Sequence, residues 1–201
     1  MASLAIQRVK REFKEVVTSS EAENSQIKLE MVAENLKHLQ GEIKGPPDTP
    51  FEGATFILDI LIPDSYPFNP PKVKFATKIW HPNISSATGA ICLDILKDQW
   101  AAAMTLRTVL LSIQALLASA EPDDPQDAVV AKQYKETPEI YHMTAKFWAE
   151  FFAGGNPSSY SADLRQKVKS LCDMGIQSLD AVRALSHYNW DATTAVESIF
   201  S

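Results

Sequence analysis

The sequence predicts an α+β fold in which one helix precedes a four-stranded antiparallel sheet and further helices follow. Three observations indicate this order. An amphipathic helical pattern opens the chain, short apolar or alternating runs fill residues 26–75, and apolar runs at helical spacing continue from residue 106. The chain has 201 residues, enough for one domain of ~150 residues and a small second unit.

The apolar residues of the first segment recur at helical spacing and share one arc of the helix. They are Ile6, Val9, Phe13, Val16 and Val17. The basic residues fall on the remaining surface, and they are Arg8, Lys10, Arg11 and Lys14. Such a basic face is either a solvated surface or a docking surface for an acidic protein partner.

The next segment has the pattern of an antiparallel meander. The runs QIKLEMV, HLQGEIK and TFILDILI are separated by turn chemistry, and a fourth short run ends at Phe75. Two proline-rich stretches, GPPDTPFEG and PDSYPFNPP, lie between the runs. Proline has no backbone N–H to donate, so we expect these stretches at the rim of the sheet.

Helices are expected in the second half of the chain. Residues 105–120 are apolar over a wide arc and predict a buried helix, which the prolines of EPDDPQDAVV end. A last long helix is predicted from Pro138, with Thr137 as its N-cap.

The composition predicts two units. The first covers 1–152, a Gly- and Ser-rich linker covers 153–161, and three short helices form a bundle over 162–201. Ser178 and Asp191 are the expected N-caps of the second and third of these helices.

Charge and cysteine usage narrow the class of protein. The net charge of −6 makes broad binding to nucleic acid or to a membrane surface unexpected. Cys92 and Cys172 are too few for a disulfide framework, and no clustered Cys and His spacing predicts a metal site. No signal peptide or membrane-spanning run is recognisable, so we expect a cytoplasmic protein, or one that is also nuclear.

Four motifs occur in a fixed order: YPFNPPKVKF at 66–75, HPNI at 81–84, GAICLDIL at 89–96 and PDDP at 122–125. In order and spacing they resemble the signature of ubiquitin-conjugating enzymes, over residues 4–152. The tail, with MGI at 174–176 and NWDATTAVESIF as its third helix, resembles a ubiquitin-associated domain. The combination resembles the huntingtin-interacting conjugating-enzyme subfamily, known for building ubiquitin chains of the proteasome-targeting linkage.

The resemblance implies that Cys92 accepts ubiquitin from the activating enzyme as a thioester and passes it to a lysine amine. Sulfur suits this task because it is both a nucleophile and a good leaving group. The implied partners are ubiquitin, the activating enzyme, ubiquitin ligases and polyubiquitin chains, with the chain itself a monomer. No metal or organic cofactor is implied, because the activating enzyme consumes the ATP. The alternatives are a catalytically silent ubiquitin-binding protein of the same fold and a cysteine hydrolase.

His81 has two interpretations. It is either a general base for Cys92 or a ring whose hydrogen bonds fix the turn at Pro82, and the resemblance implies the structural role. Asn83 either donates a hydrogen bond to the oxyanion formed during transfer or braces the loop that carries Cys92.

Two carboxylates belong to the expected site. Asp124 either orients the acceptor lysine, which the resemblance favours, or starts a helix after Pro125. Asp94 is expected to be a solvated loop acid. Cys172 follows Leu171 in a helical pattern and is expected to pack rather than to react.

The resemblance also implies docking surfaces. Prolines around Phe68 should force its ring outward to contact ligases, together with Ala101, Ala102 and Ala103. The basic helix face, Arg8, Lys10, Arg11 and Lys14, would dock the activating enzyme and overlap with ligase contacts. In the tail, the expected ubiquitin contacts are Met174, Gly175, Ile176, Ile199 and Phe200.

Three positions depart from the pattern of the family. Ile176 stands where an aromatic residue is usual, and Ile199-Phe200 stands where two leucines are more frequent. The alanines 101–103 stand where many ligase-pairing relatives carry Ser-Pro-Ala.

Overall fold

The computed structural model describes residues 3–18 and 26–201, and it has the predicted α+β architecture. Helix α1 (Leu4–Thr18) precedes an antiparallel sheet with the strand order β1-β2-β3-β4. The strands are β1 (Ile27–Val32), β2 (Asn35–Lys44), β3 (Thr55–Leu61) and β4 (Lys72–Phe75). The later helices are α2 (Leu106–Ala118), α3 (Ala128–Glu136), α4 (Pro138–Ala153), α5 (Ser161–Asp173), α6 (Ser178–His187) and α7 (Ala192–Phe200).

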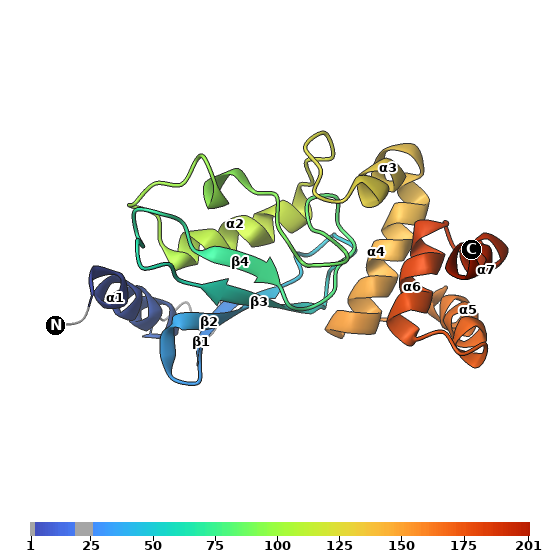
Figure 1. The fold of residues 1–201 in the computed structure, drawn as a ribbon, viewed down its shortest axis with the longest axis horizontal. Helices are drawn as coiled ribbons and strands as arrows, with labels where there is room; N and C mark the ends of the chain where they lie inside the picture. The colour runs from blue at the N-terminus through green and yellow to red at the C-terminus, as the bar shows by residue number, and fades with distance from the viewer. Residues whose placement is uncertain (1–2, 19–25) are drawn as a thin grey trace.

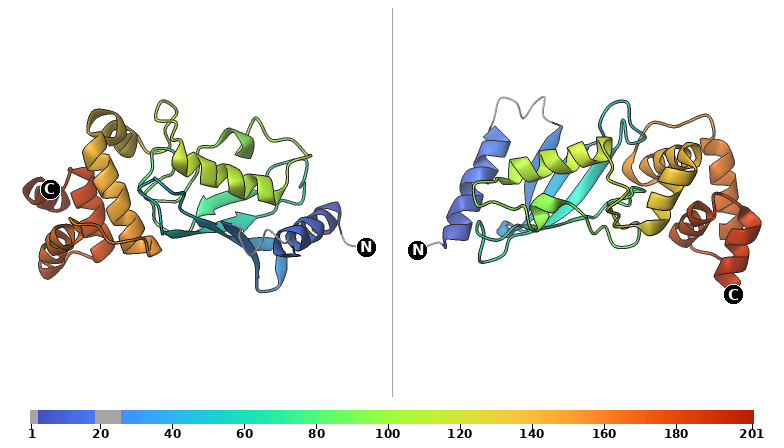
Figure 2. Two further views of the ribbon diagram at one scale, coloured as in Figure 1. Left: turned by 180° about the vertical axis from the view of Figure 1, so that it is seen from behind. Right: turned by 90° about the horizontal axis from the view of Figure 1, so that it is seen from above.

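The main core lies between the sheet and α2, which lies across one sheet face (Figure 2). Alternate residues of β2 and β3, including Leu39, Ile43, Leu58 and Ile60, are fully buried on this face. Gly41 lets α2 approach the sheet closely, because a Cβ at this position would lie 2.9 Å from Leu110 Cδ2. Each large apolar side chain buried here contributes roughly 1.5–3 kcal/mol.

The sequence predicted helix α3 only as an alternative, in which Asp124 starts a helix after Pro125. It begins directly after the proline-rich stretch, with Asp127 as its N-cap, and the Asp127 carboxylate accepts a hydrogen bond from Val130 N at 3.3 Å. The suggestion that Asp124 starts a helix is therefore wrong. Thr137 precedes α4 as predicted, but its hydroxyl donates to Gln133 O and makes no cap bond to α4.

The tail contains the predicted three helices, α5 to α7. Asp191 caps α7 by accepting a hydrogen bond from Thr194 N at 3.1 Å, which confirms that prediction. The prediction for Ser178 is wrong, because Ser178 already lies in the first turn of α6 and Gln177 occupies the N-cap without a side-chain cap bond. Helix α4 extends to Ala153, where Gly154 with φ 69° ends it in the left-handed conformation.

The two ends of the molecule carry different elements. Figure 1 places α1 at one end of the long axis and α5, α6 and α7 at the other, with the sheet between them. In the described residues, 3–18 and 26–201, no helix has the length and apolar character needed to cross a membrane.

Candidate active site and docking surfaces

Cys92 lies at the side of an open groove. Its backbone N–H donates to Asn83 O at 2.8 Å, which holds the cysteine beside the His81-Pro82-Asn83 stretch. The groove has a volume of about 420 Å³ and lies between this stretch, one side of α2 and the loop that carries Glu121 and Asp124. The thiol is partly exposed, so an incoming acyl group can reach the sulfur.

Two charged groups of opposite sign approach the sulfur. Asp124 Oδ2 lies 3.5 Å from Cys92 Sγ, and Lys97 Nζ lies 3.3 Å from it. The hydrogen bond to Cys92 and the electrostatic interaction with this side chain raise the pKa of Lys97 above its ordinary value. The structure therefore places a carboxylate and an ammonium group around one sulfur.

His81 has no lone pair available for Cys92. The ring is fully buried, its Nδ1 accepts a hydrogen bond from Asn83 N at 3.0 Å, and its Nε2 lies 3.0 Å from Leu116 O. These partners assign the hydrogen to Nε2, because a carbonyl oxygen only accepts. Burial lowers the pKa of His81 to about 4. The geometry is that of a neutral structural ring, and not that of a base for Cys92.

Asn83 and Pro82 hold the neighbouring loop in place. The Asn83 amide donates to Glu121 O at 2.8 Å and to Asp124 O at 3.0 Å, while its Oδ1 accepts from Glu121 N at 2.8 Å. Both amide hydrogens are therefore used, and none is left for an oxyanion. The Pro82 carbonyl accepts from Gln126 N at 2.9 Å. Of the two roles considered for Asn83, this geometry supports the brace.

Asp94 lines the groove, but its side chain makes a hydrogen bond within the turn that it begins. It begins the short 3-10 helix η1 (Asp94–Leu96), and its Oδ1 accepts from Ile95 N at 2.7 Å. Among the described residues, no cluster of three or more His, Cys, Asp or Glu side chains could hold a metal ion.

Phe68 and the alanine loop form one exposed surface. The Phe68 side chain is 70% exposed, as the flanking prolines predicted, and Ala101, Ala102 and Ala103 are all exposed. Trp100 connects the two, because its Nε1 donates to Pro67 O at 2.8 Å.

Arg8 does not lie on the exposed basic face of α1, where the sequence predicted it. Lys10, Arg11 and Lys14 are exposed on α1, but Arg8 is mostly buried: its guanidinium pairs with Glu12 and donates to Met104 O at 3.1 Å. Arg8 thus connects α1 to the loop after the alanines, and the exposed basic face is formed by the other three residues.

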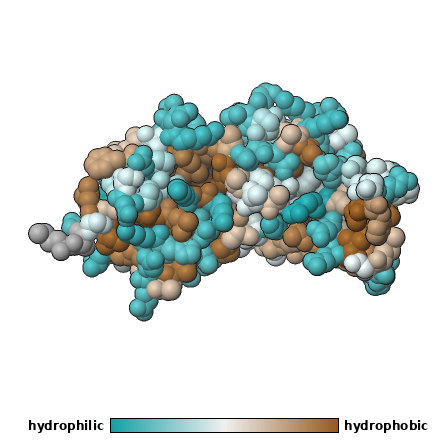
Figure 3. Space-filling model, viewed as in Figure 1, coloured by the Kyte–Doolittle hydropathy of each residue, from teal (hydrophilic) through white to brown (hydrophobic). Residues whose placement is uncertain are grey.

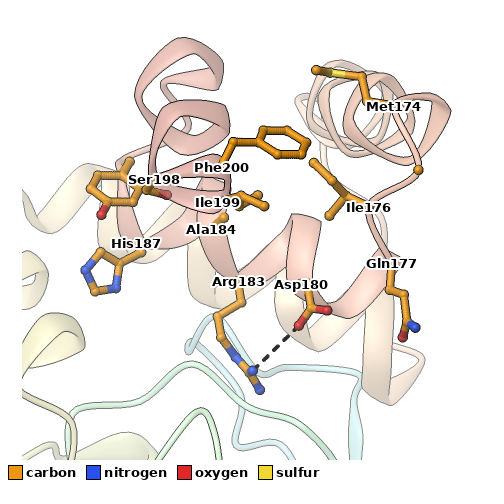
Figure 4. Close-up of a pocket in the computed structure, with 12 residues that line it drawn as sticks. Met174, Ile176, Gln177, Asp180, Arg183, Ala184, His187, Ser198, Ile199 and Phe200 are labelled. Carbon is orange, nitrogen blue, oxygen red and sulfur yellow. Dashed lines mark ion pairs between the residues drawn. The ribbon is translucent and has the colours of Figure 1, made fainter.

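A second pocket of about 640 Å³ lies on the tail, between the end of α7, α6 and the loop after α5. In Figure 4, Ile176, Ile199 and Phe200 converge on it, with Met174 at its edge. Phe200 is 66% exposed and Met174 is 54% exposed. Gly175 has φ 91°, the left-handed conformation that turns the loop here. Apolar surface also gathers over the tail helices at the right-hand end of Figure 3.

Comparison with known proteins identifies the family. The family model described as ubiquitin-conjugating enzyme matches residues 8–149. The chain belongs to the ubiquitin-conjugating enzyme family. It is 62% identical over 201 residues to human ubiquitin-conjugating enzyme E2 K, and 59% identical to the Drosophila melanogaster ubiquitin-conjugating enzyme E2-22 kDa, with both alignments covering all of each chain.

A solved structure agrees with this assignment. The E2 domain of a Toxoplasma gondii ubiquitin conjugating enzyme superposes with a TM-score of 0.68 and 51% identity, covering 73% of this chain and 97% of that one. As a ubiquitin-conjugating enzyme, the chain is a transferase that carries ubiquitin through a thioester and works with ubiquitin, an activating enzyme and ligases.

Three polar residues of this conjugating enzyme were not predicted from the sequence. Lys97 follows Cys92 by five positions, a short separation that could have suggested proximity. Glu12 follows Val9 by three positions and precedes Val16 by four, so helical spacing alone places it on the buried face. Gln133, which is 5% exposed, gave no comparable signal, because its partners lie 53 or more residues away in sequence.

Proposed function

We propose that Cys92 is the residue that carries ubiquitin. What supports this is the position of its sulfur on an open groove beside Asp124, whereas Cys172 packs against the core of the tail. In the loading step the Cys92 sulfur forms a bond to the C-terminal carbonyl carbon of ubiquitin, and the thiolate of the activating enzyme leaves. The groove would hold the extended C-terminal segment of ubiquitin.

In the transfer step, the acceptor lysine nitrogen forms a bond to the same carbonyl carbon and the bond from carbon to Cys92 sulfur breaks. The amine must lose a proton, and an amine has a pKa near ~10.4 in water. The Asp124 carboxylate at the edge of the groove orients this amine and takes its proton late in the reaction. Asn83 keeps Asp124 in place through the hydrogen bond to Asp124 O.

We further propose that the chain acts as a monomer and builds polyubiquitin of the proteasome-targeting linkage. In this proposal the tail is a ubiquitin-associated domain. Its apolar pocket around Ile176 and Phe200 binds ubiquitin or a chain and raises the local concentration of acceptor or product. The exposed surface around Phe68 binds ligases, and the basic face of α1 binds the activating enzyme.

The test uses the full chain with activating enzyme, ATP and ubiquitin. Wild type and Cys172→Ser are expected to form an adduct that a thiol reductant removes. Cys92→Ser is expected to form an adduct that resists the reductant, because the serine ester is not a thioester. A reducible adduct in Cys92→Ser would refute the assignment of Cys92. A wild-type chain that forms no adduct would favour a silent binding protein.

The chain linkage and the tail need separate measurements. Mass spectrometry of the chains formed identifies the linkage, and a predominance of another linkage would refute that part of the proposal. Phe200→Ala is expected to weaken ubiquitin binding, measured by NMR titration, since it removes the most exposed apolar side chain of the pocket. Unchanged binding would refute the role of the tail pocket.

A further inference from the structure

The tail packs against α3 and α4 through buried polar contacts. Trp148 Nε1 on α4 donates to Ser186 Oγ on α6 at 2.8 Å, and Trp190 Nε1 donates to Thr144 Oγ1 on α4 at 2.9 Å. Ser186 and Thr144 are fully buried. A buried polar group that is left without its hydrogen-bond partner destabilises the folded state. Any other placement of the tail would separate these pairs, so they fix the tail in one position.

Gln133 on α3 is the centre of a further set of contacts. Its Oε1 accepts from Trp80 Nε1 at 2.8 Å, and its Nε2 donates to Ser186 O at 3.2 Å and to Asn189 Oδ1 at 2.8 Å. Turning the amide over would direct N–H groups at the Trp80 N–H and would direct oxygen at two acceptors. The orientation of Gln133 is therefore set by its partners.

The segment that leads into α3 holds the His81-Pro82-Asn83 stretch in place. Gln126 and Asp127, just before the helix, donate their backbone N–H groups to Pro82 O at 2.9 and 3.0 Å. The Asp127 carboxylate accepts from the Ser86 N–H at 3.0 Å and from the Ser86 hydroxyl at 2.6 Å. One nine-residue helix is thus connected at its start to the His81-Pro82-Asn83 stretch and to the tail through Gln133.

We propose that Gln133 is a positioning residue for ubiquitin transfer: its side chain connects the docked tail to Trp80, and so supports the adjoining His81-Pro82-Asn83 stretch. The inference rests on the proposed roles of Cys92 and Asn83. Asn83 braces Asp124, so a shift of this stretch moves the carboxylate relative to the sulfur. Small displacements of a reacting group are costly, because a shift of about 1 Å can lower a rate by about 100-fold.

The reaction that isolates this role is single-turnover discharge of the preformed Cys92 thioester to free lysine. Free lysine has no ubiquitin surface for the tail pocket to bind, so avidity for an acceptor ubiquitin does not enter the rate. Gln133→Met removes all three hydrogen bonds at similar volume and is expected to lower the maximum rate about tenfold, an effect of about 1.4 kcal/mol. The lysine concentration at half-maximal rate is expected to stay unchanged.

Two milder variants, both at Asn189, test the hydrogen bond between Gln133 and the tail. Asn189 has φ 52°, a conformation that Gly and Asp both adopt. Asn189→Gly deletes one acceptor of Gln133 and is expected to slow discharge about threefold, between the wild-type rate and the tenfold loss expected for Gln133→Met. Asn189→Asp keeps the acceptor and is expected to restore the rate. Lys132→Met, at an exposed position of α3, is the matched control and should discharge as wild type.

A spectroscopic measurement separates positioning from general loss of stability. In ¹⁵N-labelled chains, Asn189→Gly is expected to shift the Trp80 indole N–H resonance through Gln133, whereas Asn189→Asp leaves it in place. Wild-type discharge rates in both Gln133→Met and Asn189→Gly, with the thioester formed normally, would overturn the inference. Equal slowing in Asn189→Gly and Asn189→Asp would also overturn it. A wild-type chain that forms no thioester would instead overturn the proposed function.

Discussion

Both ring nitrogens of His81 are occupied, so its protonation in the folded chain breaks the hydrogen bond from Asn83 N to Nδ1. The pKa of His81 is lowered to about 4 by burial, whereas the same residue in the unfolded chain titrates near ~6.5. Between these values the unfolded state binds the proton and the folded state does not. The folded state is therefore expected to lose stability as the pH falls through this window.

The comparison of wild type with His81→Gln isolates this effect, because glutamine does not titrate. The neutral His81 ring contributes to the free energy of unfolding fully above about pH 6.5 and not at all below about pH 4. The contribution amounts to about 3 kcal/mol, at ~1.4 kcal/mol per pH unit. We expect the difference in free energy of unfolding between the two chains, measured in urea, to narrow from pH 7 to pH 5. A difference that is independent of pH would contradict the buried neutral ring.

Lys97 is expected to compete with external acceptors, since its Nζ lies 3.3 Å from Cys92 Sγ. Acylation of Cys92 removes the hydrogen bond and the charge interaction with this side chain that raise the pKa of Lys97. The free amine can then form an amide with the ubiquitin carbonyl while the bond to sulfur breaks, and its proton passes to solvent. We expect a reductant-resistant adduct at Lys97 that increases from pH 7 to pH 9, as more amine is deprotonated.

Mass spectrometry of the peptide that contains Lys97 detects this product. Lys97→Arg keeps the positive charge but removes the nucleophile, so it should abolish the adduct while thioester formation continues. The exposed Lys132→Arg is the control and should behave as wild type. Persistence of the full adduct in Lys97→Arg would show that another lysine is the acceptor.

Among the elements, α1 is tied to the rest of the enzyme by one buried carboxylate. Glu12 is 2% exposed, pairs with Arg8, and accepts hydrogen bonds from Tyr66 OH at 2.7 Å and Leu106 N at 2.9 Å. Burial and the nearby Glu12 carboxylate raise the pKa of Tyr66 far above its ordinary value, so its hydroxyl remains a donor. Glu12 thus connects α1, the Phe68 turn and the start of α2.

Glu12→Ala is expected to lower the free energy of unfolding by about 3 kcal/mol or more, because it leaves Arg8 as a buried charge without its partner. Urea denaturation measures this value. Glu15→Ala on the exposed side of the same helix is the control, and surface changes of this kind usually stay within about 0.5 kcal/mol. Equal effects of the two substitutions would contradict the central role of Glu12.

The elements differ in how well the sequence predicts them. The strands were predicted because one face of each is buried, so alternation marks them directly, as in β3. Helix α3 was predicted only as an alternative because it follows two prolines and its buried side includes Gln133 rather than only apolar residues. The position of Arg8 was mistaken for a related reason: its partner Glu12 is an acid on the apolar arc, and hydropathy patterns do not identify buried charge pairs.

At the scale of the whole molecule, the packing of the tail (α5 to α7) against the preceding part of the chain, here called the body, could not be predicted. Gly and Ser in the connecting segment suggest an independent tether, whereas Asn156 in that segment packs against Gly53 of the body. Glu150 on α4 pairs with Arg165 on α5, whose guanidinium lies 5.3 Å from the Phe151 ring centre. Contacts between such distant residues leave no local pattern in the sequence.

This shared core predicts how the chain unfolds. Phe147 and Trp190 stack edge to face with ring centres 4.9 Å apart, joining α4 to the tail. Body and tail should therefore unfold together, and the urea transitions followed by tryptophan fluorescence and by far-UV circular dichroism should coincide. Trp190→Ala removes this ring contact and the hydrogen bond to Thr144 Oγ1, which should cost about 3 kcal/mol or more. Its two transitions are expected to separate, with the tail helices melting first. Coincident transitions in Trp190→Ala would mean that other contacts, such as those of Gln133 and Arg165, suffice to couple the two parts.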